Sequence, residues 1–186
     1  MLWTAPPPAR ECQGCGRCLR LHARSDELDL AIGYDAFPQG QAHHKRRLLF
    51  TETYLCIFNA ETTGIASPIS IDDYVRLPHV LTSLKPGRSV RGVVDEALDK
   101  LGLRRTVALT TPRFLTVPSL VVRAPVIATM HARLARLFAG ELGLSISPPP
   151  VALGEVAVSL LWHASYDQDP AHKWLRQLIV RLAVEL

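Results

Sequence analysis

The sequence has few cysteines and no long apolar run, and each shortage excludes a class of protein. Only 4 cysteines occur in 186 residues, and three lie within residues 12–18, so a disulfide framework spread over the fold is excluded. No segment approaches the roughly 18 to 20 consecutive apolar residues of a membrane span. The N-terminus, MLWTAPPPAR, lacks a basic segment followed by an apolar one and does not fit a secretory signal. We therefore expect a cytoplasmic protein without membrane contact.

The usual catalytic signatures are also missing. The chain contains no GxGxxG, no P-loop, no HExxH and no GxSxG. Its 7 histidines and 17 acidic residues show no spacing that selects a catalytic pair. We predict that the protein is not an enzyme and carries no cofactor. The content of 48% hydrophobic and 20% charged residues is typical of a packed globular domain.

One cluster of metal-binding residue types is present near the N-terminus. Cys12, Cys15 and Cys18 are spaced as thiolates are around iron–sulfur clusters, and His22 follows. A cluster protein needs a fourth thiolate, commonly followed by proline, whereas a Cys3His set suits zinc. A small zinc or iron–sulfur protein organised by this segment is therefore an alternative function. Our main interpretation is that residues 1–25 are disordered and that the protein has no metal site.

From residue 28 onward, short β-prone runs alternate with segments of helical spacing. Ser70, three residues before Asp73, predicts a capped helix that Pro78 must end. Gly102 stands where the helix over residues 90–101 should end. The alternation predicts an α/β fold with a mainly parallel, doubly wound sheet. The expected strands are 28–33, 47–51, 53–58, 79–84, 105–111, 125–130 and 156–164, and further helices are expected after Thr129 and after Asp169.

The strand ends are the expected binding site, because the ligands of such sheets lie there, beside helix N-termini. Arg113 offers a guanidinium suited to a carboxylate, and Tyr34 and Phe114 can flank an aromatic or apolar body. These features predict a small organic acid as ligand. Structural roles compete: a helix cap for Thr129, packing for Phe114 and His79, and solvation for Arg113. The predicted contact set is Gly33, Tyr34, His79, Thr82, Ser83, Thr111, Pro112, Arg113, Phe114 and Thr129.

The order of the segments from residue 26 to about 182 resembles a known family. The resemblance rests on ELDLAIGY, RRLLFTETYLCIF, ISIDDYVRLPHVLTSL, VVDEALDKLGLRRTVALTTPRFLTVPSLV, VIATMHARLARLFA, LSISPPP and SLLWHASYDQDPAHKWLRQLI. Together they resemble the effector-binding domain of LysR-type transcriptional regulators. This resemblance implies a two-lobed, type 2 periplasmic-binding-protein-like fold, with lobe I formed by 26–78 and 150–186 and lobe II by 79–149. The chain would cross near His79 and return near Pro148 to Pro150.

The resemblance also implies partners. An effector acid between the lobes would change how attached winged helix-turn-helix domains hold a promoter, within a homo-oligomer. The segments of the family that precede this region, the helix-turn-helix and the first strand, helix and strand of lobe I, have no counterpart here. The first lobe is therefore expected to be incomplete, and DNA contact to require the missing helix-turn-helix. Residues 1–24 match nothing in the family and fit a displaced reading frame or a misassigned start.

Overall fold

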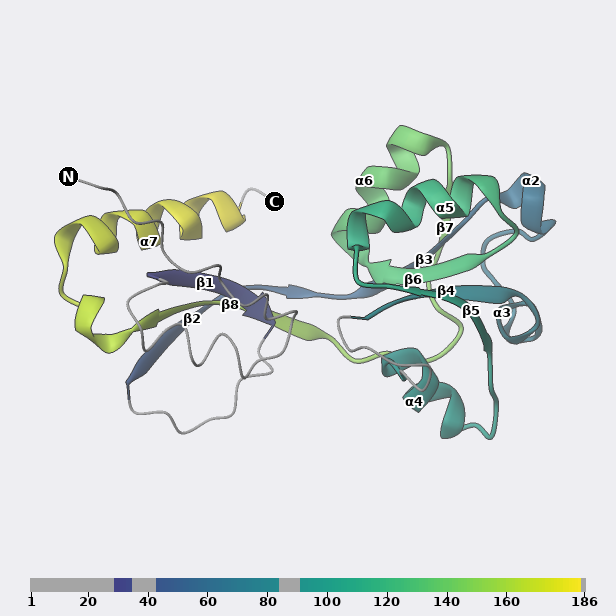
Figure 1. Ribbon diagram of the computed structural model, residues 1–186, viewed down its shortest axis with the longest axis horizontal. Helices are drawn as coiled ribbons and strands as arrows, with labels where there is room; N and C mark the ends of the chain where they lie inside the picture. The colour runs from purple at the N-terminus through teal and green to yellow at the C-terminus, as the bar shows by residue number, and fades with distance from the viewer. Residues whose placement is uncertain (1–28, 35–42, 84–90, 185–186) are drawn as a thin grey trace, which may run out of the picture.

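The strands of the chain form two separate sheets, side by side along the long axis of the molecule (Figure 1). The computed structural model describes residues 29–34, 43–83 and 91–184. The fold class expected from the sequence, a mixed α/β fold of two lobes, is confirmed. In the described part of the chain, no helix has the length and apolar character needed to cross a membrane.

The smaller sheet has three strands, all antiparallel. Its order is β1 (Leu30–Tyr34), β8 (Val156–His163) and β2 (His44–Glu52). The helix α7 (Pro170–Val184) lies along one face of this sheet, after the short 3-10 helix η2 (Ala164–Tyr166) (Figure 1). We call this unit the three-stranded lobe.

The larger sheet has five strands, in the order β5 (Thr106–Thr111), β4 (Pro78–Thr82), β6 (Ile127–His131), β3 (Tyr54–Phe58) and β7 (Ser145–Ser147). The strand β4 runs parallel to β5 and β6, whereas β3 runs antiparallel to β6 and β7. The expectation of a mainly parallel sheet was therefore wrong. Alternating strands and helices indicate parallel pairing only where each crossover returns to the same sheet, and here the chain changes sheet twice.

Helices cover both faces of this five-stranded lobe (Figure 1). One face packs with α3 (Ile71–Arg76) and α4 (Val93–Asp99), while α2 (Ala60–Thr63) follows β3 directly. The other face packs with α5 (Val117–Arg123), which follows the 3-10 turn η1 (Phe114–Thr116), and with α6 (Ala132–Leu142). Each face has its own apolar cluster, one around Phe58, Tyr74 and Leu98, the other around Ile57 and Val121.

Several helix boundaries follow directly from the sequence. The Ser70 hydroxyl accepts a hydrogen bond from the Asp73 N–H, as the capping pattern predicts. Gly143 ends α6 at φ +65°, where a side chain would be strained. The segment around Pro118 is helical, because proline is tolerated in the first turn of a helix. Thr129 was predicted wrongly as a helix cap: α6 begins after His131, so Thr129 lies inside β6.

The first passage of the chain from the three-stranded sheet to the five-stranded sheet takes a single residue, Thr53. Glu52 ends β2 in one sheet, and Tyr54 begins β3 in the other. The predicted crossing near His79 is therefore corrected, because β3, α2 and α3 already belong to the five-stranded lobe. The return lies between Ser147 and Val156, and includes the predicted Pro148–Pro150 segment.

Candidate functional site

The strand ends that face the three-stranded lobe bring together the first group of candidate residues. Because β4, β5 and β6 are parallel, Thr82, Thr111 and His131 share one edge of the sheet. Thr82 is opposite Thr111, and the Ser83 N–H donates to the Thr111 carbonyl at 3.0 Å. Four of the predicted contact residues, at 82, 83, 111 and 113, therefore lie at this edge.

His131 is the centre of an aromatic group at the same edge. The ring of Tyr34, from the three-stranded lobe, stacks on it with centroids 4.7 Å apart, and the Tyr34 Oη lies 2.9 Å from the His131 Nδ1. Tyr54, opposite His131 on β3, has its centroid at 5.2 Å, and Phe114 at 6.4 Å. Burial lowers the pKa of His131 below its usual value, although the Glu52 carboxylate acts in the opposite direction. The imidazole is therefore mainly neutral at pH 7.

Two charged residues lie at the crossing between the sheets. Glu52 is buried, and its Oε1 accepts a hydrogen bond from the Thr53 N–H at 3.1 Å. Arg133, in the first turn of α6, places its Nε 3.6 Å from the Glu52 Oε2 and its guanidinium carbon 4.2 Å from the centroid of the Phe50 ring. Its Nη1 is buried and has no hydrogen-bond partner in the described part of the chain. One arginine donor is thus free for a further acceptor.

Arg113 lies between Pro112 and η1, just after β5. Its backbone is fixed: its N–H donates to the Thr111 hydroxyl at 3.2 Å, and its carbonyl accepts from the Thr116 hydroxyl at 2.8 Å. Its side chain is exposed. Among the residues that the structure describes, the Arg113 guanidinium has no ion-pair partner. A carboxylate that reached this edge would meet an unneutralised cation.

His79 and Thr129, two other predicted contact residues, belong to a buried polar network instead. His79 is 0% exposed, and its Nε2 donates to the Tyr74 carbonyl at 2.6 Å. Thr129 lies 2.7 Å from the Tyr74 hydroxyl and 3.5 Å from the Cys56 sulfur. Burial lowers the pKa of His79 to about 4, although its hydrogen bond to Tyr74 opposes the shift. Both side chains therefore contact the protein interior rather than the edge.

The same network holds α4 against the sheet. The Arg105 guanidinium, whose side chain is 1% exposed, donates through Nε to the Asp95 Oδ1 at 2.8 Å and through Nη2 to Oδ2 at 2.9 Å. Its Nη1 lies 3.3 Å from the His79 Nδ1. Since Nε2 carries the proton that is donated to Tyr74, Nδ1 is the acceptor of this bond. Burial opposes ionisation of Asp95, but the hydrogen bonds from Arg105 and Gly92 leave its pKa below the usual value.

Sequence reasoning missed Tyr54, His131, Glu52 and Arg133. The strand predicted over residues 125–130 ended before His131, so Thr129 was the last polar residue of that strand and was chosen as the ligand contact. The position of Tyr54 at the edge follows from its pairing with His131, which no local pattern shows. Of the remaining candidates, Gly33 is paired with Ser159 inside the three-stranded sheet, and Pro112 precedes η1.

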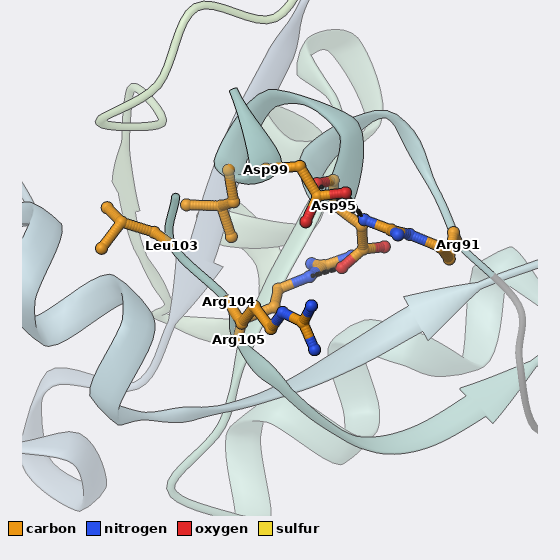
Figure 2. Close-up of a pocket in the computed structure, with 7 residues that line it drawn as sticks. Arg91, Asp95, Asp99, Leu103, Arg104 and Arg105 are labelled. Carbon is orange, nitrogen blue, oxygen red and sulfur yellow. Dashed lines mark hydrogen bonds and ion pairs between the residues drawn. The ribbon is translucent and has the colours of Figure 1, made fainter. Parts of the chain in front are cut away.

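A separate pocket of about 260 Å³ opens beside α4, away from this edge (Figure 2). In Figure 2, the side chain of Arg105, from the residues leading into β5, points toward Asp95 of α4, and that of Arg91, which precedes α4, points toward Asp99. Arg91 pairs with Asp99, and Arg105 pairs with Asp95. These pairs neutralise most of the lining charge, so the pocket is a poor match for a charged ligand.

No group of side chains suited to a metal ion is found in the described residues. The predicted N-terminal cluster of Cys12, Cys15, Cys18 and His22 lies outside the described residues. Cys56, in contrast, is buried, and burial raises the pKa of its thiol to about 11. It is packed as a small apolar side chain, as expected from its place in a β-prone run.

Comparison with known families gives a direct assignment. Residues 19–183 match the family described as "LysR substrate binding domain". The chain belongs to this family. The match begins at residue 19, and the resemblance seen in the sequence begins at residue 26. The comparisons give no support to the zinc or iron–sulfur alternative.

Curated relatives of this chain include bacterial transcriptional activators. The chain is 34% identical over 168 residues to the HTH-type transcriptional activator NagR of Ralstonia sp.. The aligned region covers 90% of this chain and 54% of the relative. It is 33% identical over 155 residues to the activator NahR of Pseudomonas putida, with coverages of 83% and 50%. The chain thus spans about half the length of the curated relatives it matches.

Solved structures agree with the family assignment. The regulatory domain of MexT, a transcriptional activator in Pseudomonas aeruginosa, superposes with a TM-score of 0.72 at 28% identity, covering 88% of this chain and 76% of the other. The effector binding domain of QuiR in complex with shikimate has a TM-score of 0.67 at 12% identity, covering 92% and 79%, and shares the fold. The family resemblance and the two-lobed fold expected from the sequence are therefore confirmed.

Proposed function

We propose that this chain is the effector-sensing domain of a LysR-type transcriptional regulator, and that it binds a small aromatic acid between its two lobes. One observation carries the proposal. At the edge where the five-stranded sheet faces the other lobe, three aromatic rings surround His131. Among the described residues, the buried Arg133 Nη1 has no hydrogen-bond partner and the exposed Arg113 guanidinium has no ion-pair partner. Rings that stack on a planar body and guanidinium groups that bind a carboxylate are the complement of an aromatic acid.

The contact residues we propose are a subset of those predicted from the sequence, with additions. Thr82, Ser83, Thr111, Arg113 and Phe114 are retained as ligand contacts, and Tyr54, His131 and Arg133 are added. Tyr34 also lies at this edge, where it stacks on His131 in the ligand-free chain. His79 and Thr129 act through the buried network that supports the edge. The structure of QuiR with shikimate gives precedent for a small acid in this fold.

The role of the whole regulator belongs to the proposal as well. An acid that binds the two lobe arrangements with different affinity shifts their populations, which is how effector binding would alter transcription. We propose that DNA contact comes from a helix-turn-helix region, and that the regulator acts as a homo-oligomer. Both parts of this proposal concern the whole regulator, because the chain spans 54% and 50% of the two activators.

Thermal unfolding with a panel of acids tests the proposal. Benzoate at about 100 times its Kd should add roughly 2.7 kcal/mol of stability, a rise in Tm of about 5 to 10 °C for a chain of this size. Acetate, which lacks the aromatic ring, and benzamide, which lacks the carboxylate, should give smaller shifts in Tm. Indifference of Tm to every acid tested would contradict the proposal.

Arg113→Ala provides the matched test of the carboxylate contact. The variant should lose most of the benzoate-induced rise without a change in the Tm of the ligand-free protein, because the Arg113 side chain is exposed. Arg123→Ala is the control, since Arg123 is an exposed arginine in the last turn of α5, at the far end of that helix from Arg113. An equal loss in both variants would indicate non-specific charge binding.

A further inference from the structure

Tyr34 and His131 make a contact that joins the two lobes. Tyr34 is the last residue of β1 in the three-stranded lobe, and His131 is the last residue of β6 in the five-stranded lobe. The hydrogen bond of 2.9 Å and the stack, with ring planes 23° apart, connect residues 97 positions apart in the sequence. This pair is therefore part of the tertiary contact between the lobes and does not arise from local structure.

The Tyr34 ring occupies the position on His131 at which the ring of an aromatic ligand would stack. It stacks on His131, which Tyr54 and Phe114 flank from the five-stranded lobe, while Tyr34 alone comes from the opposite lobe. Its side chain is 42% exposed, so it is not an element of either apolar core. Burial of the hydroxyl, with Tyr54 and Glu52 nearby, raises the pKa of Tyr34 to about 12, so the phenol stays protonated and can donate to the neutral imidazole.

We propose that Tyr34 is an intramolecular competitor of the effector. In the ligand-free protein its ring fills the stacking position on His131, and the effector binds by displacing it. The exchange is non-covalent: the ring stack and the hydrogen bond between the lobes are lost, the ligand ring stacks on His131, and the ligand carboxylate accepts hydrogen bonds from the arginines of the edge. Displacement frees the end of β1 from β6, and so converts occupancy into a change of the contact between the lobes. This inference rests on the proposed function.

Two variants separate the parts of the contact. Tyr34→Phe keeps the ring and removes the hydroxyl, whereas Tyr34→Leu removes both the stack and the hydrogen bond. Leu48→Ser is the matched control, because Leu48 is an exposed residue of the same sheet, 56% accessible, and belongs to no ring contact.

The ligand-free proteins are examined first. In ¹⁵N-histidine NMR spectra, assigned through His131→Gln, the Nδ1 signal of His131 should shift in Tyr34→Phe and should stay unchanged in Leu48→Ser. Small-angle X-ray scattering should show a larger radius of gyration for Tyr34→Leu, because the lobes lose a contact. An unchanged His131 signal in Tyr34→Phe overturns the proposal, since the pair would then not exist in solution.

Benzoate binding, measured by titration calorimetry, tests the competition. Removing an intramolecular competitor must tighten binding, by about 3-fold for Tyr34→Phe and about 10-fold for Tyr34→Leu, as expected for one hydrogen bond and one ring stack. Weaker binding in Tyr34→Leu overturns the proposal and makes Tyr34 a wall of the ligand site, while the proposed function stands. Absence of binding in every form, wild type included, overturns both the competition and the aromatic-acid function.

Discussion

The two lobes are stabilised by different kinds of contact. Helices cover both faces of the five-stranded sheet, and nearly all of the buried apolar side chains in the described residues belong to this lobe. In the described part of the three-stranded lobe, only Val158, Leu160 and Ala183 are buried apolar residues, and Ile32 and Leu48 are 57% and 56% exposed. The five-stranded lobe thus derives its stability mainly from apolar burial.

The three-stranded lobe relies on directional polar contacts around α7. Arg176 donates to the carbonyls of Tyr166 and Asp167, each at 3.0 Å, and its guanidinium carbon lies 4.6 Å from the centroid of the Trp162 ring. The His172 Nε2 donates to the Asp29 carbonyl at 3.0 Å. We therefore expect the three-stranded lobe to open locally at a lower cost in free energy than the five-stranded lobe.

The chain provides a separate probe for each lobe. Trp162 and Trp174 lie in the three-stranded lobe, and residues 53–153 contain no tryptophan. Once Trp3 is replaced by phenylalanine, tryptophan fluorescence reports the three-stranded lobe alone. Alkylation of buried Cys56, with Cys12, Cys15 and Cys18 replaced by serine, reports opening of the five-stranded lobe.

Phe58→Ala is expected to have the largest effect. Phe58 is fully buried in the cluster that α3 and α4 cover, and its truncation should lower the free energy of unfolding by about 3 to 5 kcal/mol. In urea titrations, the midpoint of Cys56 alkylation should fall much further than the midpoint of tryptophan fluorescence.

Leu48→Ser is the counterpart in the other lobe, where the side chain is exposed. Its effect should remain within about 0.5 kcal/mol. A loss comparable to that of Phe58→Ala would mean that this face of the three-stranded sheet is covered in solution, and the contrast between the lobes would then be wrong.

Arg176→Ala should have an intermediate effect, confined to the three-stranded lobe. It removes three hydrogen bonds from a charged group, to the carbonyls of Tyr166 and Asp167 and to the His172 Nδ1, together with the contact with Trp162, at a cost of about 2 to 3 kcal/mol. Amide hydrogen exchange should accelerate in α7 and stay unchanged in α4. Arg181→Ala, an exposed arginine on the same helix, is the control. Equal acceleration in both helices would show that the lobes unfold as one unit.

The elements of this fold could be predicted from the sequence more readily than their partners. The capping serine at 70, the apolar spacing of α4 and the β-prone runs are local signals, and each gave an element close to the observed one. The change of sheet at Thr53 could not be predicted, because β2 and β3 are equally β-prone and only their distant partners differ. The predicted crossing near His79 was wrong for the same reason, because Pro78 begins an interior strand of the five-stranded sheet.

The candidate site shows the same division. Residues at the end of a strand, such as Thr82 and Thr111, could be found because strand ends are visible in the sequence. The aromatic group around His131 depends on contacts between residues up to 97 positions apart. It also depends on β6 continuing to His131, two residues beyond Thr129, which was the predicted ligand contact. Long-range pairing therefore decides most of the chemistry of the edge.

Acid sensitivity should distinguish the lobes through His79, with a smaller effect than those of Phe58→Ala and Arg176→Ala. Its pKa falls from 6.5 in the unfolded chain to about 4 in the buried network, so the unfolded state binds more protons between these values. Stability from this residue is complete above pH 6.5 and is lost as pH falls, by about 2 kcal/mol between pH 7 and pH 5. His79→Gln, whose amide can still donate to the Tyr74 carbonyl, should lack this loss. The difference should appear in Cys56 alkylation and not in tryptophan fluorescence, because His79 lies in the five-stranded lobe. An identical pH dependence in wild type and variant would show that His79 is protonated in the folded protein, and that the network around Tyr74 and Arg105 accommodates the charge.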